Sequence, residues 1–182
     1  MNFCLWITGL PGSGKSTIVK ELELFFSQSG LDFVILGIDQ IRKVMTPEPK
    51  YTDEERGIVY RGLVLMAQLL LKHSSKNVII DATGNLRAFR KLARQRMPDF
   101  AEVYIKCPLK ICQSRETSRN AKTVEKNLYQ KAKSGQLTGN LPGISALYEE
   151  PLKPEILIPS DRLKPRESAK RIMNYVRSRW DV

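Results

Sequence analysis

The segment Gly9-Leu-Pro-Gly-Ser-Gly-Lys-Ser16 constrains the fold of this chain more than any other feature. It matches the eight-residue pattern G-x-x-x-x-G-K-[S/T], and it lies between an apolar run at 3–8 and an amphipathic stretch at 16–29. In such a strand–loop–helix context, glycines allow backbone N–H groups to close around phosphate oxygens. Lys15 can reach the β- and γ-phosphates, and the Ser16 hydroxyl can bind Mg²⁺. The pattern predicts binding of a nucleoside triphosphate, with a chance glycine-rich turn as the alternative.

Strand-like apolar runs alternate with stretches of helical periodicity along the rest of the chain. The predicted strands are 3–8, 33–38, 78–81, 101–107 and 155–158, and the predicted helices are 16–29, 52–72, 87–97 and 166–180. Five buried strands that alternate with helices predict an α/β fold of three layers, in which helices cover both faces of a parallel sheet. At roughly 150 residues per domain, the 182 residues predict a single domain, 1–182.

Residues 108–150 interrupt this alternation. The segment is polar and basic, and it carries three glycines, Gly135, Gly139 and Gly143. Long segments without regular structure in a compact domain are usually functional. We therefore expect a lid-like segment here, within the single domain.

The charge balance points to an anionic partner. Thirty Lys and Arg against nineteen Asp and Glu give a formal net charge of +11, which suits nucleic acid, a membrane surface or phosphorylated ligands. No apolar run reaches the roughly 18 residues of a membrane span, and the first strand lacks the basic and apolar regions of an export signal. Three cysteines without C-x-x-C spacing favour neither a disulfide framework nor a zinc site. We therefore expect a cytoplasmic protein with no membrane partner.

Asp39 follows the second predicted strand, and ligands of open α/β sheets bind beyond the carboxyl ends of the strands. A carboxylate there can accept the proton of a hydroxyl that attacks the γ-phosphate. The alternative role is the N-cap of the next helix, which is compatible with catalysis. Arg42 would share the helical face of Asp39, where it could hold an anionic substrate.

Asp81 directly follows the apolar residues 78–80. This is the position of a carboxylate that binds Mg²⁺ through water in phosphoryl-transfer enzymes. Because Thr83 and Gly84 come next, a role in an Asx-turn is an equal alternative. The predicted metal ligands are Ser16 and Asp81.

Several basic residues are candidates for anion binding. Arg115 and Arg119 lie four residues apart in the lid-like segment and can share a helical face, where they would neutralise charge on a transferring phosphoryl group. A solvated face is the alternative. The basic stretch 87–97 is predicted to be surface, or a rim that attracts anions. The residues predicted to bind the nucleoside triphosphate are Gly9, Leu10, Pro11, Gly12, Ser13, Gly14, Lys15, Ser16, Thr17 and Arg115.

Six sets of residues over nearly the entire chain match, in order, the motifs of one enzyme family. They are Leu5-Trp-Ile-Thr-Gly-Leu10 with Gly12 to Thr17, Asp39-Gln-Ile-Arg42, Glu55-Arg56 with Arg61, Glu102-Val-Tyr-Ile105 with Pro108, Leu109, Cys112 and Arg115, Leu128-Tyr129 with Lys131-Ala132, and Gly143-Ile144 with Tyr148, Glu149 and Pro151. In these motifs the chain resembles the adenylyl-sulfate (APS) kinases, P-loop enzymes that phosphorylate the ribose 3′-hydroxyl of APS with ATP.

The resemblance implies a role for each matching residue. Asp39 would be the general base, and Lys15 would assist transfer from ATP with Mg²⁺. Arg42, Arg56 and Lys131 would contact the APS anion. Ile144 would lie against the adenine, and Arg115 would lie near the ATP. The implied product is 3′-phosphoadenylyl sulfate, and the family is commonly dimeric.

The chain also departs from the family's pattern. The family's I-S-P-Y is here Thr83-Gly84-Asn85-Leu86, which is closer to P-loop kinases that act on hydroxyls of nucleic-acid ends or small molecules. A helix Asn of the family is Val59, and an aromatic ring that stacks on the adenine of APS is Leu141, a loss of about 0.5–1.5 kcal/mol. Another nucleotide, a sugar or a nucleic-acid 5′-end is therefore an alternative acceptor. A nucleotide-dependent nucleic-acid-binding protein is a less favoured alternative, because no nucleic-acid-binding motif is present.

Overall fold

The computed structural model describes residues 2–50, 52–118, 129–130, 134 and 140–182. The predicted site residues Arg119 and Lys131 lie outside this part of the chain. The centre of the structure is a sheet of five parallel strands in the order β2-β3-β1-β4-β5. The strands are β1 (Cys4–Thr8), β2 (Phe33–Gly37), β3 (Asn77–Asp81), β4 (Phe100–Lys106) and β5 (Ile156–Pro159). The predicted α/β fold with a parallel sheet is confirmed.

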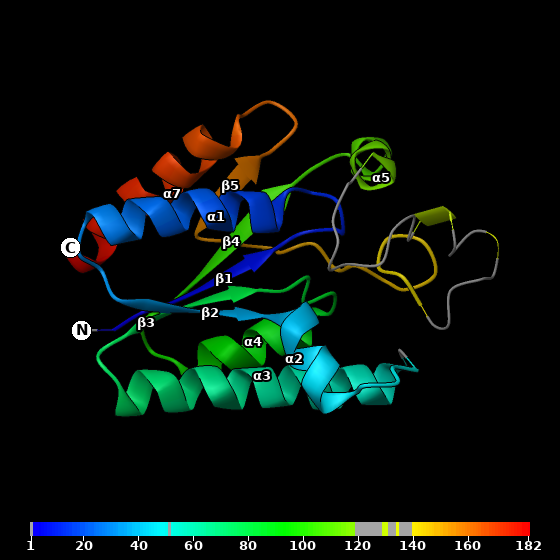
Figure 1. Cartoon of the computed structure of the whole chain (residues 1–182), viewed down its shortest axis with the longest axis horizontal. Coiled ribbons are helices and arrows are strands. Elements are labelled where there is room, and N and C mark those ends of the chain that lie inside the picture. Colours follow the sequence, from blue (N-terminus) through cyan, green and yellow to red (C-terminus); the bar gives the residue numbers. More distant parts are fainter. Residues whose placement is uncertain (1, 51, 119–128, 131–133, 135–139) are drawn as a thin grey trace.

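Helices cover both faces of the sheet (Figure 1). α1 (Lys15–Gln28) and α7 (Pro165–Trp180) lie on one face, and α2 (Ile38–Met45), α3 (Asp53–His73) and α4 (Arg87–Arg96) lie on the other. α5 (Leu109–Thr117) lies beyond the carboxyl ends of the strands. α2 and α5 were not predicted with bounds, because both are short and α2 buries no residue.

The central strand, β1, is apolar because both of its faces are buried. Phe3, Leu5 and Ile7 pack into the core cluster under α1 and α7. Cys4 and Trp6 point the other way, into the cluster under α3 and α4. A parallel strand that is buried on both faces has no side chain in water, so it needs no polar alternation.

The basic stretch 87–97 was predicted to be surface, or a rim that attracts anions, and this is wrong for Arg90. Its side chain is buried, with only 2% exposed, whereas Arg87, Lys91, Arg94 and Arg96 are exposed. Arg90 Nε donates to Glu102 Oε1 at 2.5 Å, and Nη2 donates to the Glu149 carbonyl at 2.6 Å. Arg94 forms a bidentate pair with Glu155, at 2.6 and 2.7 Å. These two arginines join α4 to β4, to the start of β5 and to the end of the lid-like segment 108–150, so they are structural.

We expect Arg90→Met to lower the free energy of unfolding by about 3 kcal/mol, since removal of one partner leaves the Glu102 carboxylate buried. For a chain of this size, that loss corresponds to a fall of about 6–12 °C in the midpoint of thermal unfolding. Arg87→Met is the matched control on the same helix. The Arg87 side chain is 45% exposed and its ion pair with Glu149 spans 3.6 Å, so its loss should cost under about 1 kcal/mol. Equal midpoints for the two variants would contradict the structural role of Arg90.

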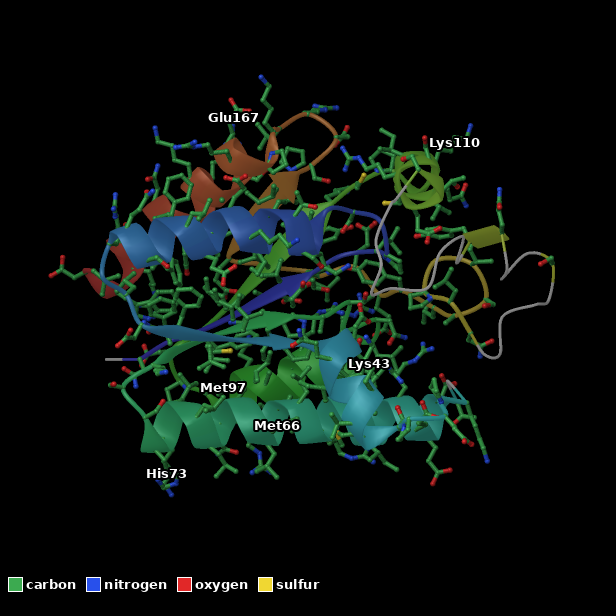
Figure 2. All side chains as sticks on the ribbon, in the orientation of Figure 1. Lys43, Met66, His73, Met97, Lys110 and Glu167 are labelled. Atoms are coloured by element: carbon green, nitrogen blue, oxygen red, sulfur yellow. The ribbon has the colours of Figure 1, made fainter. Side chains whose placement is uncertain are left out.

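The structure shows three further features. Among the described residues, no helix is long and apolar enough to cross a membrane. The single histidine, His73, lies in the last turn of α3, on the opposite side of the molecule from Lys110 of α5 (Figure 2). Cys4, Cys107 and Cys112 are free and buried.

Candidate active site

The loop between β1 and α1 depends on glycine for its shape. Gly14 is the N-cap of α1 in the left-handed conformation, with φ of +97°. Gly12 also has a positive φ, of +75°, and a Cβ atom there would collide with the Cys112 carbonyl of α5. The loop is thus closed on one side by α5 and ends at the N-terminus of a helix, where anions are favoured.

The Lys15 side chain bridges this loop. Its Nζ donates to the carbonyls of Gly9 and Leu10, at 3.0 Å in both cases. The ammonium group is therefore held where a triphosphate would bind. Ser16 is the second residue of α1, so its hydroxyl also lies at the loop.

Asp81 is the last residue of β3 and lies level with Ile7 of β1 and Gly37 of β2. The phosphate-binding loop begins two residues after Ile7, so the Asp81 carboxylate lies at the strand edge beside the root of the loop. A carboxylate and a hydroxyl are hard oxygen ligands, and Mg²⁺ is usually bound by one or two such groups together with phosphates and water. The donor set of Ser16 and Asp81 therefore fits Mg²⁺.

Asp39 and Arg42 lie on α2, beyond the end of β2. Gly37 is the N-cap of this helix, so the alternative that Asp39 is the cap is wrong; Asp39 lies in the first turn and is exposed. Arg42 follows one turn later and forms an ion pair with Glu55 of α3 at 3.1 Å, in which both side chains are largely buried. The carboxylate of Glu55 also accepts a hydrogen bond from Lys50 N at 2.6 Å. Arg42 is thus fixed in position by α3.

Arg56 is a buried cation on the first turn of α3, only 3% exposed. Its Nη2 donates to the Asn140 carbonyl at 2.7 Å, whereas Nη1 has no hydrogen-bond partner among the described residues. Burial lowers the pKa of Arg56, although arginine stays charged. A desolvated guanidinium with an unpaired nitrogen is costly unless an anion binds it. Its surroundings therefore fit an anionic ligand.

Tyr60 is a buried residue of α3 that the sequence analysis did not single out. Its hydroxyl accepts a hydrogen bond from Gly84 N at 2.8 Å. Burial raises the pKa of Tyr60, the positive charges of Arg42 and Arg56 lower it, and the negative charge of Asp39 raises it. The sequence signal that could have identified Tyr60 is a tyrosine one helical turn after Arg56.

Arg115 lies beside the phosphate-binding loop. Its Nη1 would be 3.8 Å from a Cβ atom on Gly14, and its Nη2 donates to the Ser160 carbonyl at 2.8 Å. Ser160 was not predicted as a site residue, yet its hydroxyl donates to the Ser13 carbonyl at 2.7 Å. Its position just after the fifth strand was the signal that could have identified it.

A hollow of about 490 Å³ opens between the loop and the segment 143–150. Leu10, Ile144 and Leu147 are among its lining residues, so Ile144 lies where a base could pack. Leu141, by contrast, is 6% exposed and belongs to an apolar cluster with Tyr129. The Tyr129 hydroxyl donates to the Pro11 carbonyl at 2.7 Å, which ties the lid region to the loop.

The sequence of this chain is similar to the sequences of one family of kinases. The family model for adenylylsulphate kinase matches residues 1–159. A probable adenylyl-sulfate kinase of Archaeoglobus fulgidus is 33% identical over 162 residues, which cover 89% of this chain and 98% of the relative. The adenylyl-sulfate kinase of Pseudomonas aeruginosa is 34% identical over 175 residues, which cover 94% of this chain and 84% of the relative.

Solved structures show the same likeness. The Mycobacterium tuberculosis APS kinase CysC, in complex with AMPPNP and APS, superposes with a TM-score of 0.82 at 27% identity, covering 96% of this chain and 97% of that one. A sugar kinase from Janibacter, at 19% identity and a TM-score of 0.67, shares the fold. The motifs, the phosphate-binding loop and the family match together show that the chain belongs to the adenylyl-sulfate kinase family.

Proposed function

We propose that this chain transfers the γ-phosphoryl group of ATP to the 3′-hydroxyl of adenylyl sulfate, giving 3′-phosphoadenylyl sulfate and ADP. The family match over residues 1–159 carries the proposal. The complete phosphate-binding loop supports it, and so does the buried Nη1 of Arg56, which has no partner among the described residues, because they suit a triphosphate donor and an anionic acceptor.

On the donor side, the loop from Gly9 to Thr17 binds the triphosphate. Lys15 lies in the loop and offers a positive charge to the transferring group, and Arg115 adds a second charge near Gly14. Ser16 and Asp81 would hold Mg²⁺. When bound, this ion neutralises negative charge on the phosphates.

On the acceptor side, Asp39 accepts the proton of the 3′-hydroxyl as the oxygen attacks phosphorus. Arg42 and Arg56 bind the phosphosulfate, together with Lys131, which lies outside the described residues. Ile144 packs against the adenine from the wall of the hollow. A cytoplasmic homodimer completes the proposal, since ATP is available in that compartment and buried thiols stay reduced there.

A second candidate keeps the chemistry and changes the acceptor to another nucleotide, a sugar or a nucleic-acid 5′-hydroxyl. The turn Thr83-Gly84-Asn85-Leu86 favours it, together with the aliphatic Leu141 at the place of the family's aromatic ring.

A coupled assay of ADP release with ATP and Mg²⁺ tests the two candidates side by side. APS is compared with nucleosides, hexoses and RNA with a free 5′-hydroxyl, each at several concentrations. We expect saturable turnover with APS, at a rate far above the ATPase background. Turnover with another acceptor and none with APS would replace it by the second candidate.

We expect Arg56→Met to raise KM for APS about 10- to 100-fold, since a hydrogen bond from a charged donor is worth about 1.5–3 kcal/mol. The free energy of unfolding should stay the same or rise, because replacing a desolvated cation with an apolar side chain removes its cost. Steady-state kinetics and chemical denaturation measure the two effects. Arg61→Met, at an exposed position of the same helix, is the control and should change neither. A large loss of stability with unchanged KM would show that Arg56 is structural.

A further inference from the structure

Asn85, in the turn after β3, has a buried oxygen that finds no hydrogen-bond partner among the residues that the structure describes. The side chain is 3% exposed, and its Nδ2 donates to the Leu147 carbonyl at 3.0 Å. Its Oδ1 has no hydrogen-bond partner in the described part of the chain. Because a main-chain carbonyl can only accept, this bond fixes which way the amide points and leaves Oδ1 as the unpaired atom. A buried carbonyl in this state requires an explanation, and a hydrogen-bond donor from a ligand is one.

The turn holds Asn85 firmly in place. The Asn85 carbonyl accepts a hydrogen bond from Glu149 N at 2.8 Å. The neighbouring Gly84 is held on both sides, since its N–H donates to the Tyr60 hydroxyl and its carbonyl accepts from Arg90 Nη1. These bonds fix the main chain of the turn, and the bond from Nδ2 to the Leu147 carbonyl orients the amide, so Oδ1 is a preorganised acceptor.

The position of the turn relates this oxygen to the proposed acceptor site. Thr8, the residue before the phosphate-binding loop, donates from its hydroxyl to the Thr83 carbonyl at 2.5 Å. Leu147, which anchors the amide of Asn85, lines the same hollow as Ile144. The turn thus lies at the carboxyl edge of the sheet, between the root of the loop and the segment proposed to hold the adenine.

Arg56 supplies the complementary feature. Among the described residues, Arg56 is bonded to Asn140 and has a donor without a partner, whereas Asn85 is bonded to Leu147 and has an acceptor without a partner. A ligand that satisfies both carries an anionic group and an N–H or O–H donor. In an adenine nucleotide whose 3′-hydroxyl faces Asp39, the 6-amino group of the base is such a donor.

We propose that Asn85 determines the base specificity of the acceptor site, with Oδ1 accepting a hydrogen bond from the 6-amino group of the acceptor's adenine. This inference rests on the proposed function and adds a residue that selects adenine over other purines. The 6-oxo group of hypoxanthine would place a second acceptor against Oδ1 and is rejected.

The test compares kcat/KM for APS with kcat/KM for inosine 5′-phosphosulfate, the analogue with a 6-oxo group. Wild type should prefer APS about 10- to 100-fold, the effect of leaving one buried polar group unpaired. Asn85→Ala should reduce this preference to about threefold or less, since no acceptor is left to discriminate. Asn85→Asp keeps an oxygen at this place and loses the bond to Leu147, so it should retain the preference.

Tyr148→Phe is the control for a general loosening of the segment 143–150. It removes the hydroxyl that forms the hydrogen bond of 3.2 Å with Thr8 and keeps the ring. It should lower kcat/KM for both substrates alike and leave their ratio unchanged. Equal values of kcat/KM for the two substrates in the wild-type protein would by themselves overturn the inference. A ratio in Asn85→Ala equal to that of wild type would overturn it too, and in both cases turnover of APS would leave the proposed function standing. Turnover of neither substrate would overturn both.

Discussion

Asp39→Asn should lower kcat with APS by about 10²- to 10⁴-fold, the usual contribution of a positioned general base. Asparagine has nearly the same size and also fits the first turn of α2, so the helix should keep its position. It cannot accept the proton of the attacking hydroxyl, so the transfer step loses its base. KM for ATP should change little, because the triphosphate is bound by the loop after β1. The measurement is steady-state kinetics with ATP and APS varied separately.

Asp53→Asn is the matched control for this change. Asp53 also lies in the first turn of a helix, α3, and is also exposed, so it shares the helix-dipole contribution of Asp39 without a proposed catalytic role. Its kcat should stay within about twofold of wild type, since exposed substitutions of this kind have small effects. Wild-type turnover in Asp39→Asn would reassign the role of base, with Asp81 as the next candidate.

Lys15→Met is expected to lower kcat/KM for ATP by about 10²- to 10³-fold, the cost of removing one preorganised group that stabilises developing charge. The variant keeps much of the apolar stem of Lys15 and removes the ammonium group that is bonded to the Gly9 and Leu10 carbonyls. Much of the loss should fall on kcat, because the charge on the transferring group is greatest in the transition state.

Lys20→Met, on the exposed face of the same helix, controls for the general loss of one positive charge from a protein of net charge +11. Its kinetics should match those of wild type. An effect of Lys15→Met confined to KM would show that the ammonium group contributes to ground-state binding alone.

Much of the fold could be predicted because its elements carry local signals. The run at 78–81 is apolar and ends in a carboxylate, and the strand β3 runs from Asn77 to Asp81. The predicted helix 52–72 is α3 from Asp53 to His73, and the Thr52 hydroxyl caps it by accepting a hydrogen bond from Glu55 N. Apolar periodicity and caps act over a few residues, so a single sequence reveals them.

What could not be predicted depends on contacts between residues distant in sequence. Arg90 looks like any arginine of a basic helix, and its burial follows from Glu102 of β4 and the Glu149 carbonyl, which lies 59 residues away. The unpaired oxygen of Asn85 arises in the same way, since its amide is anchored 62 residues away on Leu147. A sequence predicts which residue types stand at the strand ends, whereas three-dimensional packing decides which of their polar atoms have partners.

APS is the proposed hydroxyl acceptor of this kinase. Its identity is tested most directly by ³¹P NMR of one reaction that contains ATP, Mg²⁺ and equimolar APS, adenosine, gluconate and a 5′-hydroxyl oligonucleotide. We expect one new phosphomonoester resonance, coupled to the ribose 3′-proton of APS, that grows as ATP is converted to ADP. A phosphomonoester on another acceptor, with APS left unchanged, would contradict it.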